Sequence, residues 1–182
     1  MKSSISFVVL MLVALFVYPV AVPAQKVSKS RAAMIPTAKC QSDGLSNDEV
    51  TEILRAHNLV RAEHKVASVA WDCALERSAQ KWANKAVTQH DEDTLFGESI
   101  FVASASNQRV GTVVVRWMAE QPNWDNRHGR CAPGKVCNHY TQLVWRASRK
   151  IGCGVNRAGA GKWKVFVVCH YDPAGNTGGP AY

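Results

Sequence analysis

Six cysteines constrain this chain more than any other feature of its sequence. All six lie beyond residue 39, after an apolar N-terminal stretch. Paired cysteines persist in exported proteins, because the cell interior keeps thiols reduced and the outside does not. We therefore expect three disulfides, and the spacing of the cysteines has to select among the many possible pairings.

Cys131 and Cys137 lie six residues apart around the turn sequence 132–134. A small closed loop is expected there. Cys40 and Cys73 are paired with each other only by elimination. Zinc bound by cysteines is the alternative interpretation, and the absence of any CxxC spacing disfavours it.

Cys153 and Cys169 lie in two apolar stretches, 151–155 and 163–170, separated by a glycine-rich turn. A hairpin centred near Gly161 would set the two cysteines opposite each other. Residues opposite each other on neighbouring strands lie within disulfide reach. The sequence therefore predicts a third disulfide that joins the strands of this hairpin.

Residues 1–24 have the order of features found in a signal peptide. Lys2 provides a positive start, residues 5–22 carry no charge, and small residues surround the expected cleavage point before Gln25. A membrane anchor is the alternative, but the apolar run is marginal for spanning a bilayer and ends in prolines. We expect cleavage, secretion to the extracellular space and no membrane span in the mature chain.

Residues 25–44 are expected to form a flexible basic spacer. The chain carries 22 Lys and Arg against 14 Asp and Glu, a net charge of +8, and no acidic residue precedes position 40. The charge is therefore partly a property of this spacer, which could contact an acidic surface or a cell wall, although a solvated tail is the simpler interpretation. No basic stripe with interleaved aromatic residues is present, so binding of nucleic acid is not expected.

Residues 45–182 are long enough for one domain with its own core. Apolar spacing and capping residues, among them Ser46 and Asp72, predict helices first and an antiparallel hairpin last. This order favours an α+β fold. The other expected elements are helices near 46–65, 72–88 and 107–121, a strand or loop at 96–102 and a short helix at 138–145.

Three polar residues, His57, Asn58 and Arg61, lie on the first expected helix. His57 and Arg61 are four residues apart and share a face that also carries apolar side chains. We interpret the three as buried structural groups that tie the helix to the sheet.

Two imidazoles and two carboxylates are the candidates for chemistry: His90, Glu98, Glu120 and His139. If they converge, this donor set suits Zn²⁺ or a similar ion. The same donor set would also suit general acid–base catalysis that activates a water molecule. Sequence spacing alone does not show that they converge.

Five segments, in order, resemble one superfamily, that of the cysteine-rich secretory proteins, antigen five and pathogenesis-related one proteins, called CAP or SCP. The last two are long and specific. They are AHNLVR at 56–61, His90 with GES at 97–99, WMAE at 117–120, NHYTQLVW at 138–145 and VVCHYDPAGN at 167–176.

The resemblance implies a three-layer α-β-α sandwich with a central antiparallel sheet. It also implies that the four candidate residues line a cleft associated with a divalent metal, often zinc. The chain departs from the family pattern at Ser99, Asn138 and His170, where the family has Asn, Gly and Asn. Asn138 is expected to narrow the cleft, and His170 adds a titratable group.

Members of this superfamily bind sterols and other lipids, and act in defence or as secreted effectors. The resemblance therefore implies a secreted protein that binds a sterol or a fatty-acid-like ligand. Two alternatives remain, a metal-dependent hydrolase or protease and an effector that acts through its surface without the cleft. Binding is favoured over catalysis, because the candidate set lacks a serine or cysteine nucleophile beside a histidine.

Overall fold

The structure is a computed structural model that describes residue 40 and residues 44–182. The predicted signal peptide and most of the predicted spacer lie outside these residues. Within the described part of the chain, no helix has both the length and the apolar character needed to cross a membrane.

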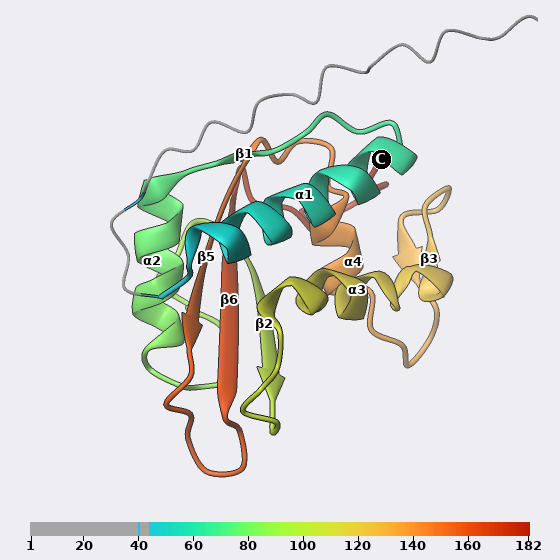
Figure 1. The fold of residues 1–182 in the computed structure, drawn as a ribbon. Helices are drawn as coiled ribbons and strands as arrows, with labels where there is room; N and C mark the ends of the chain where they lie inside the picture. Colours follow the sequence, from blue (N-terminus) through green and yellow to red (C-terminus); the bar gives the residue numbers. More distant parts are fainter. Residues whose placement is uncertain (1–39, 41–43) are drawn as a thin grey trace, which may run out of the picture. The chain divides into compact units, whose positions relative to one another are not determined.

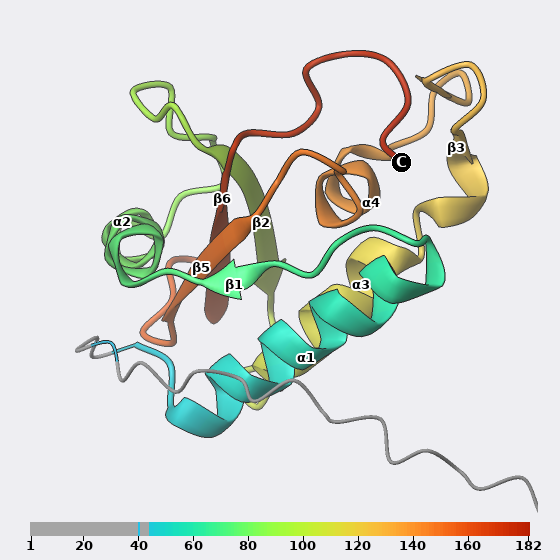
Figure 2. The ribbon, with the colours of Figure 1, turned by 90° about the horizontal axis from the view of Figure 1, so that it is seen from above.

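A four-stranded sheet, in the order β1-β5-β6-β2, forms the middle of the described domain. Helix α2 covers one face, and α1, α3 and α4 cover the other (Figures 1 and 2). The predicted α+β sandwich is therefore confirmed. The helices are α1 (Asn47–Glu63), α2 (Cys73–Ala83), α3 (Val113–Met118) and α4 (Asn138–Leu143), and the strands are β1 (Ala70–Trp71), β2 (Gly97–Ala103), β5 (Lys150–Asn156) and β6 (Val165–Asp172).

The expectation of a purely antiparallel sheet is wrong at one edge. Strand β1 runs parallel to β5, with Ala70 beside Lys150 and Trp71 beside Ile151. The strand leads straight into α2, and the N–H of Asp72 still bonds to the carbonyl of Ile151. A strand of two residues is too short to show an alternating pattern, so the sequence did not reveal it.

Both expected helix caps are present. Ser46 and Glu49 form a capping box at the start of α1, and the carboxylate of Asp72 accepts from the first N–H groups of α2. The helix expected at 107–121 is instead a 3₁₀ turn, η1 (Val110–Thr112), followed by the short helix α3. Three consecutive valines at the start of α3 explain the shortening, because β-branched side chains have low helix propensity.

The predicted hairpin is confirmed, with β5 and β6 antiparallel and Cys153 directly opposite Cys169. The three disulfides are the predicted ones: Cys40–Cys73, Cys131–Cys137 and Cys153–Cys169.

Arg61 is fully buried and donates only to backbone carbonyls. Its Nε bonds to Ala67 at 2.8 Å, and its terminal nitrogens bond to Leu143, Trp145 and Ser148 at 2.8–3.0 Å. These acceptors include the end of α4 and the turn after it. One side chain of α1 therefore fixes the segment that joins α4 to β5.

His57 and Asn58 make similar links. His57 is buried, and its Nδ1–H donates to the carbonyl of Ile53 at 2.8 Å, so Nε2 can accept from the hydroxyl of Tyr171 at 3.0 Å. The side chain of Asn58 bonds to both backbone groups of Val69. The three polar residues thus join α1 to the sheet and to the loop before it.

Stability should fall in acid because of His57. Burial, and then the charge of Arg61, lower its pKa from 6.5 to about 4. Below pH 6.5 His57 is protonated in the unfolded chain but stays neutral in the folded chain. The free energy of unfolding therefore decreases as the pH falls from 6.5 towards about 4. We expect this residue to account for a loss of about 3 kcal/mol over that range. Urea unfolding of the protein and of the His57→Gln variant, measured between pH 6.5 and pH 4, would give this loss. If the free energy of unfolding depended on pH equally in both proteins, the assignment to His57 would be contradicted.

Candidate functional site

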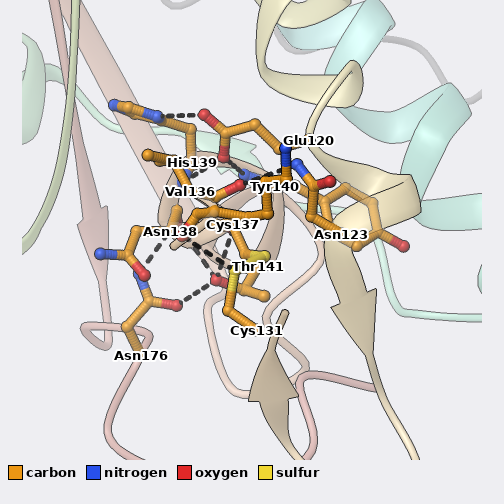
Figure 3. Close-up of polar contacts among 11 residues, drawn as sticks. Glu120, Asn123, Cys131, Val136, Cys137, Asn138, His139, Tyr140, Thr141 and Asn176 are labelled. Carbon is orange, nitrogen blue, oxygen red and sulfur yellow. Dashed lines mark hydrogen bonds and ion pairs between the residues drawn. A yellow bond between two sulfur atoms is a disulfide. The ribbon is translucent and has the colours of Figure 1, made fainter. Parts of the chain in front are cut away.

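Glu120 and His139 form the first pair of the candidate site (Figure 3). Glu120 follows α3, and its carboxylate accepts from the backbone N–H groups of His139 and Tyr140 at the start of α4, at 3.0 and 3.1 Å. Its other oxygen lies 2.6 Å from His139 Nδ1. The imidazole stacks on Trp117, with ring centres 5.9 Å apart and planes 3° from parallel. The ring is therefore held with Nε2 pointing away from the carboxylate.

His90 and Glu98 form the second pair, and His170 joins it. Glu98 of β2 lies 2.5 Å from His90 Nδ1 and 3.0 Å from His170 Nε2, and it also accepts from the N–H of Asp91. His170 is the residue opposite Glu98 on β6. Its Nδ1 lies 3.1 Å from the hydroxyl of Ser78 on α2. One carboxylate therefore holds two imidazoles.

Glu98 stays ionised in this setting. Burial alone would raise the pKa of its carboxyl group, but hydrogen bonds from His170, His90 and the Asp91 N–H outweigh burial and lower it. Since the ionised carboxylate can only accept, both imidazoles donate to it. Nε2 of His90 is then left as a lone-pair donor whenever that ring is neutral.

The structure places the four predicted residues in two separate His–Glu pairs. No hydrogen bond or ion pair of the described residues joins one pair to the other. Across residue 40 and residues 44–182, no three His, Cys, Asp or Glu side chains are grouped so that they could hold a metal ion. Each pair nevertheless presents an imidazole whose Nδ1 is bound to a carboxylate, which is how carboxylates orient metal-binding histidines in other proteins.

Helix α4 is anchored on two sides next to His139. The Cys131–Cys137 disulfide closes the loop before the helix, and Cys137 is its N-cap residue. On the other side, the side chain of Asn176 accepts from the Thr141 hydroxyl at 2.6 Å and donates to the Asn138 carbonyl at 2.9 Å (Figure 3). The side chain of Asn138 itself is exposed.

Several partners of the candidate residues could not be found from the sequence. His170 was noted as a departure from the family pattern but was not paired with Glu98. Trp117 was noted in the WMAE segment but not as a partner of His139, and Ser78 was not singled out. Ser99, the other departure on β2, is buried, and its hydroxyl has no hydrogen-bond partner among the described residues. The contact between His170 and Glu98 could be found only by knowing which residues of β2 and β6 lie opposite each other.

Apolar surface lies next to both pairs along the chain. Leu95, three residues before Glu98, is 93% exposed, and Val136, three residues before His139, is 56% exposed. The residues that come shortly after Glu120 in the chain line a hollow of about 480 Å³. It is formed by η2 (Gln121–Asn123), β3 (Trp124–Asp125), β4 (Arg130–Cys131) and the turn after them.

Comparison with known proteins gives consistent matches. Residues 54–171 match the family described as CAP, Cysteine-rich secretory protein family. Pathogenesis-related protein 1A1 of Solanum lycopersicum is 40% identical over 126 residues, which are 68% of this chain and 70% of that protein. Secreted protein PRY1 of Candida albicans is 32% identical over 146 residues, 78% of this chain and 33% of that protein.

Solved structures agree with these matches. The crystal structure of NaASP2 with Zn²⁺ superimposes with a TM-score of 0.67 and 26% identity, over 79% of this chain and 89% of that chain. The family model, the similar pathogenesis-related and secreted proteins, and the shared α-β-α sandwich all agree. The chain belongs to the Cysteine-rich secretory protein (CAP) family, with the pathogenesis-related proteins of plants among its relatives.

Proposed function

We propose that this protein is secreted, acts in defence, and binds a small hydrophobic ligand such as a sterol or a fatty acid. The observation that carries the proposal is the hollow lined by residues 122–125 and 130–133, which lie between Glu120 and His139 in the chain. Its volume lies within the roughly 300–1,000 Å³ typical of small-molecule sites. Trp124 and two prolines contribute apolar walls, and Asp125 and Arg130 contribute polar ones. The exposed Val136 lies in the loop closed by the Cys131–Cys137 disulfide, whose first residues also line the hollow.

Exposed apolar side chains support this assignment. Leu95 and Val136 expose apolar surface to water, and a bound apolar ligand would cover it. Each of these side chains lies three residues before a member of a His–Glu pair in the chain, an order that suits an amphipathic ligand whose hydroxyl or carboxylate would face the histidines. The pathogenesis-related and secreted relatives support an extracellular setting.

Saturable binding of radiolabelled cholesterol or palmitate to the purified protein is expected. Replacing Val136 by Asn should weaken binding about tenfold, because covering a valine side chain contributes roughly 1.5 kcal/mol or more. Leu59→Asn on α1 is the matched control, since Leu59 is 57% exposed and lies on a different element. Absence of saturable binding of either lipid, or equal losses in both variants, would refute the proposal.

As a second part of the proposal, we infer that a divalent metal binds between the two His–Glu pairs, which would have to approach each other to hold it. Nε2 of His90 and Nε2 of His139 would hold it, with Glu98 and Glu120 orienting the rings. A bound zinc ion supplies a positive charge that attracts a hydroxyl or carboxylate oxygen. The similarity to NaASP2, whose structure contains Zn²⁺, supports this assignment.

Catalysis is not part of the proposal. Ser78, His170 and Glu98 are hydrogen-bonded in series, the residue types of a hydrolase triad. However, His170 is fully buried, and both of its ring nitrogens are already bonded within the protein. This arrangement leaves the imidazole no access to a substrate, and it positions Glu98 instead.

A further inference from the structure

A second hollow lies after α4, away from the two His–Glu pairs in the chain. It has a volume of about 440 Å³ and is formed by the turn that joins α4 to β5 and by the C-terminal segment. Figure 2 shows this segment curving around α4 before the chain ends beside the helix. Trp145 and Pro180 give the hollow apolar walls, while Arg146, Arg149 and Thr177 give it polar ones.

Positive charge is concentrated here without an ion pair among the described residues. Arg146 and Arg149 are exposed, and neither forms an ion pair with any described residue, whereas Arg109 elsewhere pairs with Glu52 at 3.0 Å. The buried Arg61 bonds to the backbone of the same turn. Burial, and then the charge of Arg149, lower the pKa of Arg61 to about 10. The three guanidinium groups therefore favour an anion at this surface.

The hollow is also organised before any ligand arrives. One terminal nitrogen of Arg149 donates to the carbonyls of Arg146 and Ser148, which leaves its other N–H groups for a ligand. The backbone N–H of Arg146 donates to the Ala181 carbonyl at 2.7 Å, so the two walls of the hollow are joined. Arg146 itself makes no side-chain hydrogen bond with the described residues. Because Arg149 is already held in place, ligand binding has to immobilise only the side chain of Arg146, and this lowers the entropic cost of binding.

We propose that this hollow binds a phosphate group through Arg146 and Arg149. The planar guanidinium forms paired, charge-assisted hydrogen bonds to phosphate oxygens, and two of them match a phosphate dianion in charge. The hydroxyl of Thr177 adds a neutral donor. The hollow is larger than a phosphate ion and has apolar walls, so the phosphate is carried on a larger molecule, either a sugar phosphate or a lipid headgroup.

The test is a titration of the full mature protein with glucose 6-phosphate, with glucuronate as the carboxylate comparison. Binding to phosphatidylcholine vesicles with and without phosphatidic acid is measured in parallel. Arg146→Gln should weaken phosphate binding about tenfold, because it removes charge-assisted hydrogen bonds without disturbing a contact inside the protein. Arg116→Gln is the control, since Arg116 is also exposed and unpaired within the described residues but lies on α3.

Binding that depends on Arg146 and not on Arg116 supports the proposal, and the vesicle arm then assigns the source. Affinity for glucose 6-phosphate alone identifies a soluble phosphate ester, and affinity for phosphatidic acid vesicles alone identifies a lipid headgroup. Equal losses in the two variants would show that net charge alone attracts the anion and would overturn the proposal. Glucuronate binding as tightly as the phosphate, or no binding in any arm, would also overturn it.

Discussion

Replacing Arg61 by Met is expected to destabilise the domain by about 3–5 kcal/mol, the range found when one partner of a buried charged network is removed. The methionine chain fills much of the same space but donates nothing. Four carbonyls, on the loop before β1 and on the segment from α4 to β5, would lose this charged donor, and the buried bond to the Leu143 carbonyl would not be replaced. Since that segment also carries Arg146 and Arg149, binding of phosphate should weaken as well.

Urea unfolding measures this loss of free energy. Arg55→Met is the control on the same helix, because Arg55 is exposed and makes no hydrogen bond with the described residues. The control should stay within about 0.5 kcal/mol of the unmodified protein. If both variants lose the same free energy of unfolding, Arg61 does not organise the turn after α4.

Replacing Glu120 by Gln is expected to weaken zinc binding about 10- to 100-fold, the usual effect of removing a carboxylate that orients a metal-binding histidine. The amide keeps the shape of the side chain but loses the charge that holds His139 Nδ1–H. It also weakens the cap on α4, because the carboxylate accepts from two N–H groups there. A further loss of about 1 kcal/mol in stability should follow.

Calorimetric titration with zinc, combined with thermal unfolding, separates the two effects. Glu98→Gln should weaken zinc binding by a similar factor through His90. Glu92→Gln, at an exposed position, should leave zinc affinity unchanged. Unchanged zinc affinity in Glu120→Gln would rule out His139 as a ligand oriented by this carboxylate.

Local patterns were sufficient to predict much of the fold. The capping box at Ser46, the cap at Asp72 and the glycine-rich turn near Gly161 each act within a few residues, so the sequence carries them directly. The parallel strand β1 could not be found in this way, since two residues held by β5 have no periodicity of their own. The valines of α3 followed helical spacing, but their low propensity shortened the helix.

The candidate site was predictable in its residues but not in its pairing. Resemblance to the CAP family supplied His90, Glu98, Glu120 and His139, and the structure joins them as two pairs. The contact between Glu98 and His170 depends on the register of β2 against β6, two strands more than 60 residues apart in sequence. This register depends on packing across the whole sheet, so it cannot be predicted from a short sequence motif.

The order of the three disulfides has a consequence for how the proposed secreted protein would mature. Each cysteine pairs with the next one along the chain: the first with the second, the third with the fourth and the fifth with the sixth. A chain that enters an oxidising compartment from its N-terminus therefore presents the second cysteine of each pair directly after the first, before any cysteine of another pair. Native cross-links can then form in order of emergence, with no need for an isomerase to reshuffle them.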